Sequence, residues 1–178
     1  MYRVHEDFRV GVEGVSDMSD PEGMFDLYEE LRKITSALDE NHIAYALCGG
    51  LAMAVYDHPR TTIDMDILIL SESLEPTLEV AKQLGYSIRG LDMHFGEIEI
   101  RRVSRIHPTT RHVLTLDMLL VTPAIREVWE SRVQADVEDG TLSVVSLEGL
   151  IALKRFRSSG TDMDDIAKLE EDIRDETN

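Results

Sequence analysis

The chain has 178 residues, of which 43% are hydrophobic and 30% charged, a composition typical of a globular protein and not of a disordered or fibrous one. This length predicts a single domain over residues 1–178. The formal net charge of -17 argues against a general affinity for nucleic acid, which would need a local basic patch. One cysteine, Cys48, excludes an intramolecular disulfide, and no apolar run reaches the ~20 residues that cross a bilayer. We therefore expect a cytoplasmic protein that does not bind membranes.

The first third of the chain predicts an arm, a helix, a strand, a glycine turn and a second helix. Residues 1–19 show no sustained period and are expected to form an arm or a short strand. Asp20-Pro21 is typical of a helix start, and apolar residues at helical spacing continue that helix to Asn41. A short apolar strand over 43–48 then ends in Gly49-Gly50, and residues 51–56 suit a helix.

The rest of the chain alternates strands with helices. Residues 62–70 form a predicted strand with apolar groups on both faces, as in the centre of a sheet. Further strands are predicted over 86–88, 97–103 and 112–121, a hairpin around Asp139-Gly140 in 133–145, and helices over 73–85, 124–131, 147–156 and 163–172. Residues 147–178 are thus a C-terminal helical segment. The alternation predicts an α/β (α+β) fold, in which a mixed β-sheet is flanked by helices.

Three aspartates stand out in these apolar strands. Asp64 and Asp66 lie two residues apart, so both side chains emerge from one face of their strand. Such close carboxylates repel each other unless a cation lies between them, and Mg²⁺ (or Mn²⁺) is the candidate. Asp117 interrupts the apolar strand 112–121. If the two strands are neighbours, the three carboxylates can hold two ions, clamp a triphosphate and activate a hydroxyl, with Asp117 as a candidate acceptor of its proton. A solvated edge strand, or a salt bridge of Asp117, is the alternative.

Gly49-Gly50 lies where a strand ends and a helix starts. Glycine there lets the backbone approach a ligand, and the helix N-terminus offers free N–H groups to phosphate. A plain tight turn is the alternative for this pair by itself. Combined with the carboxylates, the pair indicates a triphosphate site.

The spacing of these motifs resembles a known signature. Gly49-Gly50, then thirteen residues, then Asp64-Met65-Asp66-Ile67 is similar to the signature of the nucleotidyltransferase superfamily that includes DNA polymerase beta. The segments CGGLAMAVYDHPRTTIDMDILI and LIALKRFRSSGTDMDDI together resemble the abortive-infection (AbiEii-type) nucleotidyltransferase-like proteins. The resemblance covers roughly residues 25–170 and implies a nucleotidyltransferase-like fold.

This resemblance also implies an activity and site residues. The implied activity is Mg²⁺-dependent transfer of a nucleoside monophosphate from an NTP to an acceptor hydroxyl on RNA or protein, in a toxin-like role with an antitoxin-like partner. Gly49 and Gly50 would contact the triphosphate. Asp64 and Asp66 would bind metal, and Asp117 would take the third carboxylate position.

The later motif adds nucleotide-site candidates and two departures. Lys154 matches a lysine that helps to hold phosphates, and Asp162 and Asp165 match the downstream aspartates. A lysine that packs its stem on the core and acidic residues that favour the first turn of a helix are the alternatives. Leu51 stands where the family usually has Ser or Thr, and Ser159 where an arginine is common.

Several interpretations stay open at this point. Cys48, Tyr56 and Trp129 are expected in the core. The basic side chains before Asp117 either receive an acceptor or the triphosphate, or pair with the surplus of acids; they are Arg101, Arg102, Arg105, His107, Arg111 and His112. The acceptor is alternatively a small molecule, as in aminoglycoside nucleotidyltransferases. A third hypothesis is a nucleotide-binding or partner-binding domain without turnover.

Overall fold

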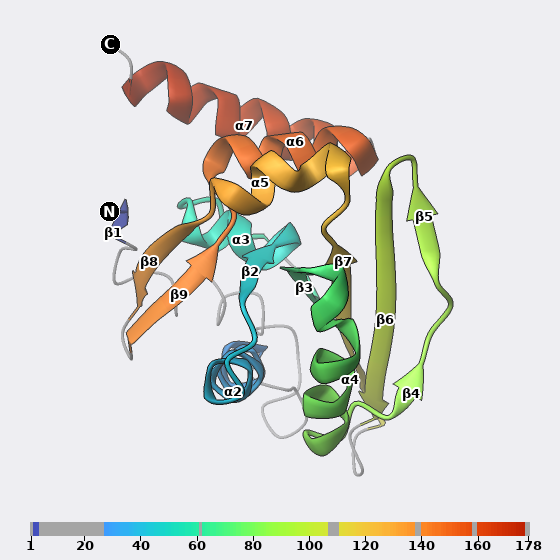
Figure 1. The fold of residues 1–178 in the computed structure, drawn as a ribbon. Helices are drawn as coiled ribbons and strands as arrows, with labels where there is room; N and C mark the ends of the chain where they lie inside the picture. Colours follow the sequence, from blue (N-terminus) through green and yellow to red (C-terminus); the bar gives the residue numbers. More distant parts are fainter. Residues whose placement is uncertain are drawn as a thin grey trace.

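The structure is a computed structural model that describes residues 2–3, 27–60, 62–106, 111–137, 140–157 and 160–176. Within these ranges, nine strands form one mixed sheet in the order β1-β8-β9-β2-β3-β7-β6-β4, with β5 paired to β6 (Figure 1). The strands are β1 (Tyr2–Arg3), β2 (Tyr45–Cys48), β3 (Asp64–Ile69), β4 (Ile88–Arg89), β5 (Met93–Phe95), β6 (Ile98–Ile106), β7 (Val113–Leu120), β8 (Val133–Val137) and β9 (Gly140–Val144).

Helices cover both sides of this sheet. They are α2 (Leu27–Glu40), α3 (Gly49–Val55), η1 (Ser71–Ser73), α4 (Leu74–Gln83), η2 (Pro123–Ile125), α5 (Arg126–Glu130), α6 (Leu147–Arg157) and α7 (Gly160–Glu176). In Figure 1, α5, α6 and α7 lie together on one side of the molecule and α2 with α4 on the other. None of the helices among the described residues is both long enough and apolar enough to span a membrane.

The predicted mixed sheet flanked by helices is confirmed, and the differences concern element boundaries. The helix expected from residue 51 begins at Gly49, because the glycine pair forms its first turn. The strand predicted over 97–103 extends through Ile98–Ile106, and the short strand β5 was not predicted. The hairpin expected in 133–145 is present as antiparallel β8 and β9. The Asp20-Pro21 helix start and most of the arm over 1–19 lie outside the described residues.

The most apolar strands form the centre of the sheet. β3 and β7 run parallel, and β2 and β6 flank them in antiparallel pairing. Cys48, Tyr56 and Trp129 are buried, as predicted. Leu31 and Ile34 of α2 follow the helical spacing of buried positions and pack into the same core. The buried helix stripe and the two-sided apolar strands therefore explain how the centre of the sheet is covered on both faces.

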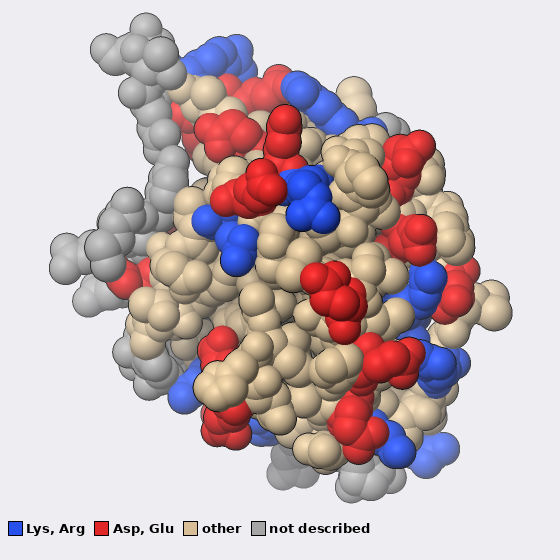
Figure 2. All heavy atoms as spheres, in the orientation of Figure 1, with Lys and Arg blue, Asp and Glu red and all other residues tan. Residues whose placement is uncertain are grey.

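The surface carries both signs of charge. Figure 2 shows separate groups of acidic side chains on the drawn face, with lysines and arginines beside many of them. The positive charges on this face are thus mixed with acids rather than gathered into one basic patch.

Candidate active site

A row of polar side chains crosses one face of the central strands. Cys48 of β2 is the register partner of Asp66 on β3. Asp66 is in turn the partner of Asp117 on β7, which faces Arg102 on β6. Register partners point to the same face of a sheet, and Asp64 shares that face because it lies two residues before Asp66. The structure therefore brings the three predicted aspartates together.

The Gly49-Gly50 turn is built around the Asp66 carboxylate. Gly49 has a φ of +66°, and a Cβ at this position would overlap the carboxylate of Asp66. The backbone N–H of Gly50 donates a hydrogen bond to Asp66. A Cβ on Gly50 would lie 2.9 Å from the Cβ of Thr62. Both glycines are therefore required for the close approach of the turn to β3.

A pocket of about 200 Å³ opens at this row. Asp64, Asp66 and Asp117 all line it, together with Gly50. The rest of its lining consists of three arginines, two threonines and an apolar group: Arg60, Arg102, Arg157, Thr62, Thr161, Met93, Phe95 and Ile100. Carboxylates, guanidinium groups and an apolar wall thus share one small concave site.

Two carboxylates of this pocket, Asp64 and Asp66, have raised pKa values. Asp66 is 6% exposed, and burial raises its pKa to about 6, with a further contribution from the charge of Asp117. Asp64 is half-buried, and burial followed by Asp117 also raises its pKa. Like charges and desolvation both disfavour the ionised forms. A cation in the pocket would relieve both effects.

Arg102 supplies one such cation. Its Nε donates to Oδ1 of Asp117 at 2.7 Å and its Nη2 to Oδ2 at 2.6 Å. These hydrogen bonds are the main reason why the pKa of Arg102 is raised. Among the described residues, no three His, Cys, Asp or Glu side chains converge as a ready metal site. The hard oxygen donors of the three aspartates nevertheless suit Mg²⁺ or Mn²⁺ in kind, with Asp117 held by Arg102.

Lys154 and Asp162 do not line this pocket but a small adjoining cavity, which Asp66 also lines. The Lys154 ammonium is 2.7 Å from Oδ2 of Asp165 and 3.8 Å from Oδ1 of Asp162, and all three side chains are buried. Nε of Arg60 is 2.9 Å from the same Asp165 oxygen. Lys154 therefore joins α6 to α7 and, through Asp165, to Arg60 at the pocket. Ser159 lies outside the described residues, and Leu51 is buried in the core.

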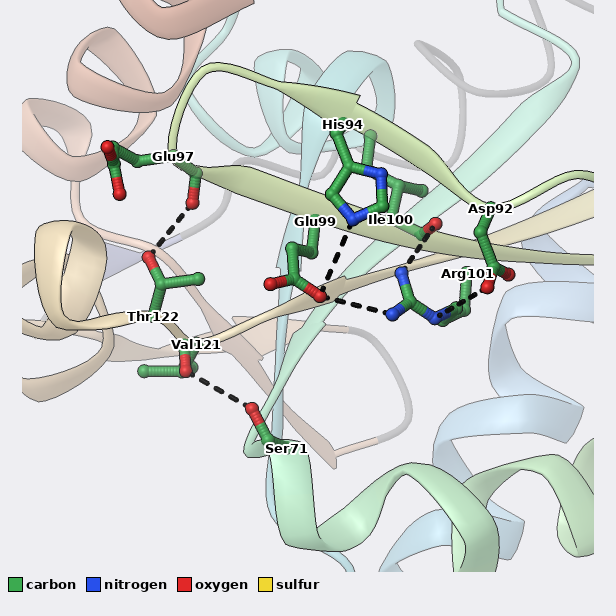
Figure 3. Close-up of polar contacts among 9 residues, drawn as sticks. All are labelled: Ser71, Asp92, His94, Glu97, Glu99, Ile100, Arg101, Val121 and Thr122. Atoms are coloured by element: carbon green, nitrogen blue, oxygen red, sulfur yellow. Dashed lines mark hydrogen bonds and ion pairs between the residues drawn. The ribbon is translucent and has the colours of Figure 1, made fainter.

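The arginines on the opposite face of β6 form ion pairs. Arg101 bridges Asp92, at 3.4 Å, and Glu99, at 3.1 Å, and His94 also approaches Glu99 (Figure 3). Arg105 lies 2.7 Å from Glu30 of α2. These pairs agree with the interpretation that the basic stretch pairs with acidic residues. The contacts of Arg101 with Asp92 and of His94 with Glu99 also link β5 and the segment before it to β6. His107 lies outside the described residues.

Sequence reasoning did not single out several residues of the pocket. Arg102 stood in the basic stretch, but its pairing with Asp117 depends on the register of β6 against β7. Arg157 and the apolar pair Met93 and Phe95 carry no motif of their own. Arg60 is part of the lead-in to Asp64, which is the one signal in the sequence that could have found it.

Comparison with known proteins identifies the fold. The chain matches no protein-family model and no curated protein. Among solved structures, it is similar to a candidate nucleotidyltransferase from Thermotoga maritima, with a TM-score of 0.54 and 14% identity over 89% of this chain and 95% of that protein. The chain has the nucleotidyltransferase fold. It is also similar to ANT(2″)-Ia in complex with adenylyl-2″-tobramycin, with a TM-score of 0.54 and 16% identity over 82% of this chain and 87% of that one.

A second structure of ANT(2″)-Ia, an antibiotic-resistance factor solved in solution, gives a TM-score of 0.53 and 14% identity over 83% of this chain and 90% of that one. The predicted nucleotidyltransferase-like fold is therefore confirmed. The AbiEii-type likeness stays a prediction from the sequence motifs.

Proposed function

We propose that this chain is a metal-dependent nucleotidyltransferase that transfers a nucleoside monophosphate from an NTP to an acceptor hydroxyl on RNA or protein. One observation carries the proposal: Asp66 and Asp117 are register partners on neighbouring parallel strands, and Asp64 lines the same pocket. The Gly49-Gly50 turn packs directly against this cluster. A toxin-like role and an antitoxin-like partner remain predictions from the sequence resemblance.

The reaction assigns a role to each group of the pocket. The acceptor oxygen forms a bond to the α-phosphorus while the bond from that phosphorus to the bridging oxygen of pyrophosphate breaks, and the electron pair leaves with pyrophosphate. Asp64, Asp66 and Asp117 would hold Mg²⁺, which when bound offsets phosphate charge and makes the hydroxyl more acidic. Asp117 is the candidate acceptor of the hydroxyl proton.

Two arginines of the pocket suit the polyphosphate. Nη2 of Arg60 would lie 3.3 Å from a Cβ on Gly50, so this guanidinium stands beside the glycine turn. Arg157 lines the same pocket. Guanidinium groups and exposed backbone N–H groups are common partners of phosphate oxygens. Thr62 and Thr161 add hydroxyl groups to the lining, whereas the position after the glycine pair, Leu51, offers none.

The charges in the pocket lining indicate which class of acceptor substrate the pocket suits. Three carboxylates and three guanidinium groups line it, so the described lining has no excess of acid to attract a polycation. This balance gives a polycationic, aminoglycoside-like acceptor no electrostatic advantage over a neutral one. The apolar wall of Met93, Phe95 and Ile100 lies in the same lining and could contact the body of the acceptor.

Two measurements test the proposal. Calorimetric titration of each NTP, with and without Mg²⁺, is expected to give metal-dependent binding that Asp64→Asn/Asp66→Asn abolishes. Glu72→Gln is the matched control, because it removes an exposed carboxylate beyond the other end of β3. Incubation with α-labelled NTP and separate RNA, protein and small-molecule pools should then label RNA or protein.

Three outcomes would change the conclusion. Binding without pyrophosphate release would indicate a nucleotide-binding domain without turnover. Label in the small-molecule pool alone would contradict the proposed acceptor class. NTP binding that does not change in the double variant would refute the assignment of the carboxylates.

A further inference from the structure

Arg102 and Asp117 form a bidentate salt bridge. Each of two guanidinium nitrogens donates to a different carboxylate oxygen, at 2.7 and 2.6 Å. Such bidentate pairs are among the strongest hydrogen-bonded contacts in proteins. The Asp117 side chain is 6% exposed and that of Arg102 35%, so the arginine reaches from the pocket surface to a buried carboxylate. Both side chains line the pocket, so their contact lies at its surface.

The backbone next to Arg102 is shaped for this side chain. The N–H of Gly90 donates to the carbonyl oxygen of Arg102 at 2.9 Å. A Cβ on Gly90 would lie 2.9 Å from Cγ and 3.0 Å from Cβ of Arg102. Any larger residue at this position would push the arginine stem aside. The orientation of Arg102 toward Asp117 is thus set by packing as well as by charge.

Arg102 and a divalent ion need the same atoms. Both oxygens of Asp117 already accept a hydrogen bond from the Arg102 guanidinium, so a divalent ion at these oxygens would lie beside a positive charge that repels it. Asp64 and Asp66 line the same pocket as Asp117, so a positive charge there acts on all three carboxylates. A guanidinium and a divalent ion are two ways of supplying that charge.

We propose that Arg102 is the resident counter-ion of Asp117, that it competes with a divalent ion for this carboxylate, and that it thereby couples metal binding to nucleotide binding. The inference rests on the proposed function, since it takes Asp64, Asp66 and Asp117 as the ligands. When the ion binds, the guanidinium gives up at least one hydrogen bond and turns to the pocket. A triphosphate offers it new acceptors there, so nucleotide favours the metal-bound arrangement, and by thermodynamic linkage metal favours nucleotide.

Binding of Mn²⁺ to the full chain, followed by the electron paramagnetic resonance signal of the free ion, tests this competition. Without nucleotide, Arg102→Gln is expected to bind Mn²⁺ on the order of 10- to 100-fold more tightly, the equivalent of one hydrogen bond to a charged group. Arg102→Lys, which keeps the charge but loses the two-point contact, should fall between wild type and Arg102→Gln.

Arg101→Gln is the matched control. It removes the same charge from the neighbouring position of β6, but Arg101 points to the other face, where it pairs with Asp92 and Glu99 (Figure 3). This variant should bind Mn²⁺ with nearly the affinity of wild type. A non-hydrolysable NTP should raise the Mn²⁺ affinity of wild type by a larger factor than that of Arg102→Gln, because only wild type has a guanidinium to transfer from Asp117 to phosphate.

Thermal unfolding gives a second measurement that does not depend on turnover. In EDTA, Arg102→Gln should unfold at a lower temperature than wild type, because its three carboxylates lack their counter-ion. Saturating Mn²⁺ should raise its unfolding temperature by more than it raises that of wild type. Arg102→Lys should show the same trend to a smaller extent, which keeps the test valid if the glutamine variant does not fold.

The outcomes separate this inference from the proposed function. If wild type binds Mn²⁺ through Asp66, and neither Arg102 variant binds it more tightly, the competition is refuted and the nucleotidyltransferase proposal stands. Equal gains for Arg101→Gln and Arg102→Gln would also overturn it, because they would reflect net charge alone. If neither wild type nor any variant binds Mn²⁺, with or without nucleotide, the metal site itself fails and both proposals fall.

Discussion

Replacing Asp66 by asparagine is expected to stabilise the protein while it removes a proposed metal ligand. The pKa of Asp66 is raised from its ordinary value of 3.8 to about 6, first by burial and then by the charge of Asp117. At about 1.4 kcal/mol for each pH unit of displacement, this corresponds to a penalty of about 3 kcal/mol for the ionised form. Asparagine is never charged and can still accept the hydrogen bond of the Gly50 N–H.

The pH dependence of this effect follows from the direction of the pKa change. Because the folded-state pKa of Asp66 is the higher one, the folded protein binds more protons between about pH 4 and pH 6. Its contribution to stability is therefore present below about pH 4 and is lost as the pH rises through about 6. Asp66→Asn should thus exceed wild type by about 3 kcal/mol near pH 8 and match it near pH 4.

Denaturant unfolding in EDTA, at a series of pH values, measures this difference. Glu72→Gln, at an exposed position, should change the free energy of unfolding by no more than about 0.5 kcal/mol at any pH. Addition of Mg²⁺ should stabilise wild type and leave Asp66→Asn nearly unchanged, because binding to the folded state shifts the unfolding equilibrium. A variant less stable than wild type near pH 8, or a difference that does not depend on pH, would show that the charge of Asp66 is not unfavourable in the folded protein.

Three other predictions concern the surroundings of the site. Gly49→Ala should destabilise the protein by about 1–3 kcal/mol more than Gly96→Ala in denaturant unfolding. Both glycines have positive φ, but only the Cβ added at Gly49 would overlap the Asp66 carboxylate, since no atom lies within 4 Å of one added at Gly96. Equal losses of stability would contradict this overlap. Lys154→Met should cost about 3 kcal/mol because Asp162 and Asp165 lose their buried ammonium partner. The exposed Lys168→Met should cost little, and similar values for the two would argue against the buried ion pair. The buried Cys48 thiol, whose pKa is raised by burial, should react with a thiol reagent at the rate of unfolding; immediate reaction in the native protein would refute its burial.

Local sequence signals were sufficient for the elements and for the core of the candidate site. The glycine pair ends an apolar strand, and strand periodicity places Asp64 and Asp66 on one face whatever the rest of the chain does. The apolar strand around Asp117 belongs in the centre of a sheet because both of its faces must be buried. Boundaries were less certain, as the helix start at Gly49 shows, because glycine is compatible with turn and helix alike.

The sequence alone did not predict which side chains form ion pairs between distant segments of the chain. The carboxylates in the apolar strands β3 and β7 indicated that a cation lies near them. The pattern did not show which residue or ion supplies it, because any cation that the fold brings close can do so. The register of β6 against β7 decided that Arg102 faces Asp117. The packing of α6 on α7 similarly directed Lys154 to Asp165.

The sequence by itself therefore determined the kind of chemistry available, because residue types and their periodicity are local properties. Only the tertiary structure decided which charges meet, since ion pairs depend on distances between elements far apart in the chain.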